Sequence, residues 1–65
     1  MKVRYDKETD VLYISFNDKI VLESDEEKPG IIIDYAEDKS IVGIEVLVAS
    51  KKMPEPNAIE YMMAY

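Results

Sequence analysis

The stretch that decides the fold is GIIIDY at residues 30–35, followed by a polar segment and then IVGIEVLV at residues 41–48. These are the two runs richest in Ile and Val, whose branched side chains pack well on a pleated surface, so both are predicted to be strands. The connector at residues 36–40 is polar and short. It suits an antiparallel hairpin and cannot hold a crossover helix between parallel strands. The rest of the chain is expected to pack on or beside this central hairpin.

The chain has 65 residues with no Cys and no His, so neither disulfides nor the usual zinc ligands can support its small core. A domain of this size buries only about 60% of the surface that its unfolded chain exposes. Association is the remaining route to stability. A homodimer is therefore the favoured expectation, with a compact monomer as the alternative.

The formal net charge is −6 and the pI is near 4.4. This balance argues against nucleic acid as a partner, because binding phosphates needs clustered Lys and Arg. An acidic surface could steer the protein to a basic protein partner, or it could serve solubility alone. The sequence has no run of 18 apolar residues, and no apolar segment of a signal peptide follows residues 1–5. We therefore expect a cytoplasmic protein with no membrane association.

Two further strands are predicted before the central hairpin, at residues 2–5 and 11–16, with a polar turn between them. In the second of these strands, side-chain alternation places Leu12, Ile14 and Phe16 on one face. This face is the more apolar one and is predicted to be the core side.

The link from the second strand to the central hairpin is mostly polar. Asn17 and Asp18 tolerate positive φ and predict a hairpin turn. A third strand is expected from residue 19 or 20 to Glu23, and the pattern leaves open which of its faces is inside. The longest polar run, residues 24–29, is interpreted as a solvated loop that Pro29 ends, with a partner or cation site as the alternative.

Both strands of the central hairpin carry apolar residues on both faces, as expected of strands that are partly covered on two sides. Gly43 within the second strand suggests a bulge or a close backbone approach. After a connector with two prolines, Asn57 is a plausible N-cap for a short helix. Its apolar face would contain Ile59, Met62 and Met63.

These elements predict one small domain, residues 1–65, of the α+β class and mainly β. An antiparallel meander of about five strands is expected in residues 1–48. Residues 49–65 are expected to supply a connector and the short C-terminal helix.

Catalytic chemistry has little support in the sequence. Neither a Cys nucleophile nor a His base exists, and no Gly-rich phosphate loop occurs. A carboxylate cluster of Asp34, Glu37 and Asp38 surrounds the central turn, and Glu45 could approach it from the next strand. Oxygen ligands suit Ca²⁺ or Mg²⁺, but the spacing is not that of an EF-hand, and turns favour acidic residues for local reasons. No catalytic, cofactor-binding or metal-binding residue is assigned, and no cofactor is expected.

Aromatic residues offer a second possible surface. Tyr5, Tyr13 and Tyr35 fall within predicted strands and could form an aromatic patch on the sheet. Without basic neighbours, packing is the better interpretation of such a patch than stacking on bases.

Four patterns in this order resemble the prokaryotic domain-of-unknown-function family 2283: DVLYI at residues 10–14, GIIIDY at 30–35, IVGIEVL at 41–47 and the Ala-Ser pair at 49–50. The resemblance covers residues 1 to about 52. It implies a small acidic protein with a meander-type sheet and no established activity. Some members of that family are suspected to be antitoxin-like partners of a small toxin.

The chain departs from the family pattern in two places. Family members often have Gly in the central hairpin turn, where this chain has Lys39 and Ser40. The segment from Met53 onward matches none of the family's patterns.

Three functions are compatible with these observations. The favoured one is a non-enzymatic protein-interaction module, and more narrowly an antitoxin-like partner of a small basic protein. A stand-alone structural or regulatory homodimer is the first alternative. A carboxylate-based binder of divalent metal ions is the second.

Overall fold

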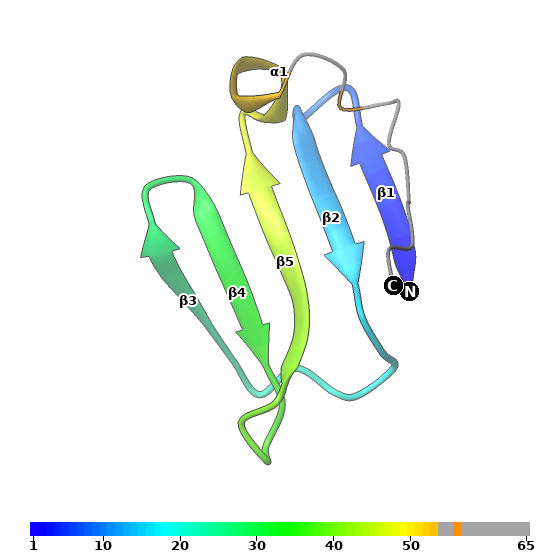
Figure 1. Ribbon diagram of the computed structural model, residues 1–65, viewed down its shortest axis with the longest axis vertical. Coiled ribbons are helices and arrows are strands. Elements are labelled where there is room, and N and C mark those ends of the chain that lie inside the picture. The colour runs from blue at the N-terminus through cyan, green and yellow to red at the C-terminus, as the bar shows by residue number, and fades with distance from the viewer. Residues whose placement is uncertain (54–55, 57–65) are drawn as a thin grey trace, which may run out of the picture.

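The computed structural model describes residues 1–53 and 56, which form one five-stranded antiparallel sheet and a short helix (Figure 1). The elements in chain order are β1 (Lys2–Asp6), β2 (Val11–Ser15), β3 (Glu23–Lys28), β4 (Ile31–Tyr35), β5 (Ile41–Leu47) and α1 (Ala49–Lys52). The predicted class, a mainly β protein with five antiparallel strands followed by a short helix, is confirmed.

The strand order is β1-β2-β5-β4-β3, so the sheet is not the simple meander that was predicted. β2 pairs with β5 and not with β3, and the chain crosses from β2 to the far edge before β3 begins (Figure 1). The high apolar content of β5 explains its central position in the sheet. β5 is the longest of the Ile- and Val-rich strands, and at the centre of the sheet it can pair with β2 on one side and β4 on the other.

The third strand lies later in the chain than predicted. Residues 19–22 belong to the crossing connection, and the strand is formed by the acidic run Glu23–Lys28, interpreted above as a loop. All six residues of β3 are exposed. An edge strand is held by backbone pairing to one neighbour, here β4, and therefore needs no apolar face. Apolar alternation, the signal used for the prediction, is absent from such a strand.

The core lies on one face of the sheet, where β2 and β5 meet α1. Leu12 and Val46 are opposite each other in the β2–β5 register, and they bury the helix residue Ala49. Ile14 packs against this cluster, so the predicted core face of β2 is confirmed for Leu12 and Ile14. Phe16 is an exception: it follows the last residue of β2 and is 41% exposed.

The helix α1 occupies the segment predicted to be a connector, and the helix predicted from Asn57 lies outside the described residues. Val48 turns the chain into α1 with left-handed dihedrals, φ 50° and ψ 50°. Asp10 attaches the start of α1 to the β1–β2 turn through hydrogen bonds. Its backbone oxygen accepts from the Ala49 N–H, and its carboxylate accepts from the N–H and the hydroxyl of Ser50. A side chain distant in sequence thus caps the helix.

The turn between β4 and β5 has the backbone geometry of a three-residue hairpin loop. The Lys39 N–H donates to the Ala36 carbonyl at 2.9 Å, and Lys39 has a φ of 69°. A turn followed by a left-handed residue is typical of three-residue hairpin loops, and the left-handed position usually holds Gly. Lys39, in the turn where family members often have Gly, therefore places a side chain in a conformation that favours glycine.

We predict that Lys39→Gly raises the free energy of unfolding by about 1 kcal/mol, because a left-handed conformation penalises any residue with a Cβ. Thermal denaturation followed by circular dichroism measures the change. The matched control is Glu37→Gly in the same exposed turn, where φ is not positive. That variant should be slightly less stable than the parent, and a gain from both substitutions would contradict the explanation.

Candidate functional site

The predicted carboxylate cluster separates into two groups in the structure. Asp34 is buried on the face of the sheet opposite the core, whereas Asp38 is exposed at the tip of the turn and pairs with Lys19. Glu37 is exposed in the same turn. Of the other three, only Glu45 approaches Asp34, as predicted. Within residues 1–53, no three acidic side chains converge as a metal site would require.

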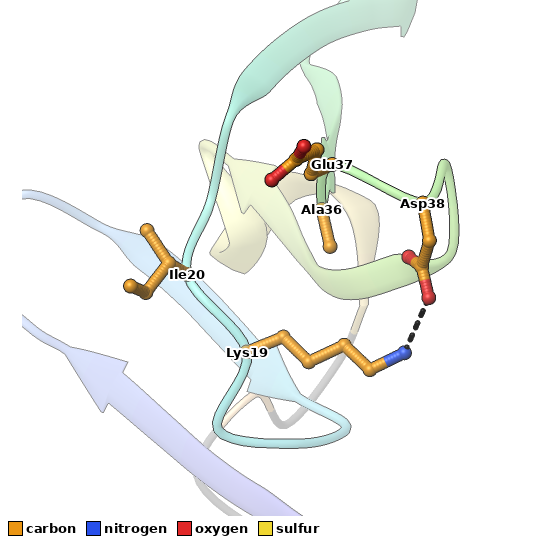
Figure 2. Close-up of a pocket in the computed structure, with 5 residues that line it drawn as sticks. All are labelled: Lys19, Ile20, Ala36, Glu37 and Asp38. Carbon is orange, nitrogen blue, oxygen red and sulfur yellow. Dashed lines mark hydrogen bonds and ion pairs between the residues drawn. The ribbon is translucent and has the colours of Figure 1, made fainter.

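A shallow hollow of about 480 Å³ lies beside this turn, lined by Lys19, Ile20, Ala36, Glu37 and Asp38 (Figure 2). The Lys19 side chain reaches across the hollow to Asp38, and the Ile20 side chain points away from that turn. The hollow is open, and two of its three charged side chains, Lys19 and Asp38, pair with each other.

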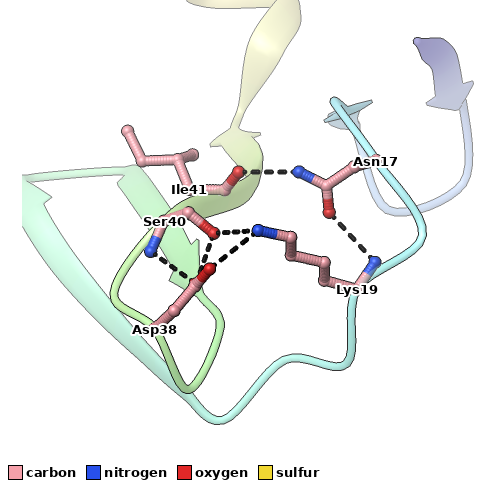
Figure 3. A network of polar contacts seen from close by, with 5 residues as sticks. All are labelled: Asn17, Lys19, Asp38, Ser40 and Ile41. Carbon is pink, nitrogen blue, oxygen red and sulfur yellow. Dashed lines mark hydrogen bonds and ion pairs between the residues drawn. The ribbon is translucent and has the colours of Figure 1, made fainter.

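The polar contacts at this turn attach the crossing connection to the end of the β4–β5 hairpin (Figure 3). The Lys19 ammonium lies 2.8 Å from an Asp38 carboxylate oxygen and donates to the Ser40 hydroxyl at 3.0 Å. The Asn17 amide donates to the Ile41 carbonyl at 3.1 Å. The hydrogen bonds from Lys19 and then Ser40 hold the pKa of Asp38 well below its ordinary value. Asn17 thus ties the connection to β5, and it does not form the predicted hairpin turn.

Asp34 is the one buried charged residue among the described residues, with 3% of its surface exposed. The Ser24 hydroxyl on β3 donates to one carboxylate oxygen at 2.5 Å, and the Tyr13 hydroxyl on β2 donates to the other at 3.1 Å. Because β5 lies between β2 and β4, Tyr13 must cross a whole strand to reach Asp34. The bonds around Asp34 therefore link β2, β3 and β4 on one face.

Gly43 makes this crossing possible. It lies between Ser15 and Asp34 in the register of the sheet, next to the bulge between β4 and β5. A Cβ at this position would lie 3.0 Å from the Tyr13 hydroxyl oxygen and 2.6 Å from the Ile14 carbonyl oxygen. The close backbone approach and the bulge predicted from Gly43 are both confirmed, and the missing side chain leaves room for the phenol.

Glu45 lies beside this network on β5. Burial raises the pKa of Glu45 above its ordinary value of 4.5, and the hydrogen bond and the negative charge of Asp34 raise it further. A carboxyl group whose pKa is higher in the folded state stabilises the protein fully below its unfolded pKa. This contribution is lost as the pH rises through the folded pKa.

We therefore expect Glu45→Gln to raise the melting temperature at pH 7, because glutamine keeps the neutral form that the folded state favours. At pH 4 the difference from the parent should shrink, since both side chains are then mostly neutral. Differential scanning calorimetry at the two pH values measures this. Glu37→Gln in the exposed turn is the control and should change stability by less than about 0.5 kcal/mol. An equal gain at both pH values would contradict the assignment.

The three tyrosines do not form one patch. Tyr5 pairs with Leu12 and shares its face of the sheet, whereas Tyr13 projects from the other face. Each phenol donates instead to a carboxylate: Tyr5 to Asp10, Tyr13 to Asp34, and Tyr35 to Glu27. The interpretation of these residues as packing and not as a stacking surface is consistent with these contacts.

A second surface of interest is the outer edge of the sheet. β3 carries four acidic residues, Glu23, Asp25, Glu26 and Glu27, and pairs only with β4 among the described strands (Figure 1). Glu26 accepts from the Gly30 N–H and Glu27 from the Tyr35 hydroxyl. Glu23 and Asp25 make no ion pair with any residue in the described part of the chain.

A family model described as "Protein of unknown function (DUF2283)" matches residues 2–50, which is 49 of the 65 residues. The chain belongs to the DUF2283 family. The resemblance found in the sequence is confirmed, and the matched segment includes all five strands of the sheet. No curated protein and no solved structure matched the chain.

Within this DUF2283 protein, the Asp34 network is complete without a ligand. No buried side-chain nitrogen or oxygen of the described residues lacks a hydrogen-bond partner, so the network needs no further group to satisfy it. Sequence reasoning identified Asp34, Glu45 and Gly43 but missed Tyr13 and Ser24 as the donors. Their pairing depends on β2 and β4 flanking β5, an order that local patterns did not show.

No helix in the described part of this DUF2283 protein has the length and apolar character needed to cross a membrane. On the acidic edge at β3, Glu23 and Asp25 make no ion pair with any other described residue. Four acidic groups in six residues raise the local negative charge along one exposed edge.

Proposed function

We propose that this DUF2283 protein is a non-enzymatic protein-interaction module that binds a small basic protein, in the manner of an antitoxin, through β3. The observation that carries the proposal is the exposed acidic edge strand β3. Its charge has the same sign as the net charge of −6, so the whole chain would steer a basic partner toward it. The proposed compartment is the cytoplasm. Cytoplasmic proteins rarely depend on disulfides, and this chain has no cysteine to form one.

The placement of the serine hydroxyls supports a role without catalysis. Each one donates to a nearby oxygen: Ser15 to the Asn17 carbonyl, Ser24 to Asp34, Ser40 to Asp38, and Ser50 to Asp10. A serine nucleophile needs an adjacent base that accepts its proton near neutral pH. The acceptors of Ser40 and Ser50 are the carboxylates of Asp38 and Asp10. Hydrogen bonds from Lys19 and Ser40 lower the pKa of Asp38, and those from Ser50 and Tyr5 lower the pKa of Asp10, so both carboxylates are weak bases.

The test is capture of the tagged protein from its native host, followed by purification of the co-eluting protein and a binding titration. The variant Glu23→Lys/Asp25→Lys reverses two charges on β3. The control Glu8→Lys/Asp18→Lys makes the same change in net charge at exposed residues outside β3. We expect a basic partner that binds the β3 variant at least tenfold more weakly and binds the control nearly as well as the parent.

Equal weakening by both double variants would contradict the assignment of β3, since only net charge would then matter. Recovery of copies of this chain alone would favour the homodimer, which is the alternative. Sedimentation equilibrium at micromolar concentration distinguishes that outcome, because a monomer sediments as a 7.5 kDa species.

A further inference from the structure

Three consecutive large apolar residues lie exposed immediately before β3. Ile20 is 87% exposed, Leu22 65% and Val21 41%. Ile20 also projects away from the β4–β5 turn beside it (Figure 2). Single exposed apolar residues are ordinary on protein surfaces, but an uninterrupted run of three is not, and such runs commonly mark a surface that a partner covers.

This apolar run is continuous with the acidic edge. The Leu22 N–H donates to the Tyr35 carbonyl at 2.8 Å, so backbone pairing to β4 already begins one residue before β3. Residues 20–28 therefore form one exposed ribbon, apolar in its first third and acidic in the remainder. From Leu22 onward its inner side faces β4, and its outer side faces no other strand in the described structure (Figure 1).

We propose that residues 20–28 bind an extended segment of the basic partner as a sixth, antiparallel strand of the sheet. This inference rests on the proposed function and deepens it by stating the partner's chemistry. Read in the partner's own direction, the segment has basic residues first and apolar residues after them. The basic residues lie beside β3, and the apolar residues cover Ile20 and Leu22.

The physical argument has two parts. An open strand edge offers unpaired backbone groups that a further strand can satisfy, and antiparallel pairing is slightly more stable than parallel pairing. Acidic side chains can also protect an edge against unwanted pairing. Protection explains β3 alone, however, and does not explain why the ribbon begins with exposed Ile20 and Leu22. A partner with complementary charge and apolar residues explains both halves.

Alternation along the ribbon defines the register of the partner. Glu23 and Asp25 lie on one face of the sheet, and Ser24 and Glu26 lie on the other. A matching antiparallel segment places basic side chains opposite the acidic positions and apolar ones opposite Leu22 and Ile20. The peptide KKTKVTI has this arrangement and serves as the probe.

Fluorescence anisotropy with the labelled peptide and the full chain tests the proposal. Two further peptides each carry two N-methyl groups, one at the third and fifth residues and the other at the fourth and sixth. Only one edge of an added strand faces β3, so methylation on that edge removes the N–H donors used in pairing. We expect one methylated peptide to bind at least tenfold more weakly and the other to stay within about threefold of the parent peptide.

Protein variants supply the second arm. Ile20→Ser/Leu22→Ser should weaken binding of the peptide about tenfold, and Val3→Ser, at an exposed apolar residue on the other edge strand, should leave it unchanged. Circular dichroism checks that each variant is folded. Equal binding of both methylated peptides, or no effect of the Ile20 and Leu22 substitutions, would overturn strand addition. Absence of binding at millimolar peptide would overturn it as well.

Failure of this inference is distinguishable from failure of the proposed function. If a captured basic protein depends on Glu23 and Asp25 but not on Ile20 and Leu22, the interaction module stands and strand addition is wrong. If no basic protein depends on Glu23 and Asp25, the proposed function itself is wrong.

Discussion

Gly43→Ala is expected to destabilise the protein by about 3 kcal/mol, because the new methyl group would lie too close to two residues of β2. Its Cβ would lie 2.6 Å from the Ile14 carbonyl oxygen, a backbone atom on the paired strand β2 that cannot rotate away. It would also lie 3.0 Å from the Tyr13 hydroxyl oxygen. For 65 residues the total stability is roughly 3–10 kcal/mol, so this one methyl group threatens the whole fold.

Urea denaturation followed by circular dichroism measures the loss. A double substitution separates the two contacts. If the Ile14 carbonyl is the main obstacle, Tyr13→Ala combined with Gly43→Ala stays at least as unstable as Gly43→Ala alone. Recovery of stability in the double variant would show that the phenol is the obstacle and that the strand backbone can adapt.

Leu12→Ala is expected to cost about 3 kcal/mol, which is typical of deleting a buried leucine side chain. Leu12 is 1% exposed and, among the described residues, is the one large side chain buried this completely. It is opposite Val46 and contacts Ala49, so its removal leaves a cavity where β2, β5 and α1 meet. The cost includes the lost burial and the incomplete collapse of the surrounding residues.

The control for this prediction is Val3→Ala, which removes apolar atoms from a side chain that is 43% exposed. It should cost less than about 1 kcal/mol. Chemical denaturation of both variants gives the comparison. Similar losses at the two positions would mean that the core does not centre on Leu12.

Strands with strong apolar patterns could be predicted from the sequence. β2, β4 and β5 lie close to the predicted ranges because Ile, Val and Leu at alternating positions both favour a strand and supply its buried face. The edge strand β3 could not be found in this way. Four of its six residues are acidic and all six are exposed, and backbone pairing to β4 holds them in a strand.

The candidate site could likewise be predicted only in part from the sequence. Asp34 and Gly43 stand out in the sequence, because each interrupts an apolar run. Their partners Tyr13 and Ser24 belong to strands whose position depends on the order of the whole sheet. Lys19 likewise meets Asp38 only because the connection from β2 crosses to the far edge. Contacts between residues distant in the chain follow from topology, which local patterns leave open.

The central place of β5 also determines when this sheet can form during synthesis. The β1–β2 and β3–β4 hairpins do not pair with each other, and β5 is the strand that pairs with both. A nascent chain that has emerged from the ribosome as far as residue 40 therefore contains both hairpins but not the strand that unites them. Two-stranded hairpins are marginally stable in water. The apolar faces of β2 and β4 consequently stay open to other chains until residues 41–47 emerge, and that interval is when this protein is most exposed to aggregation.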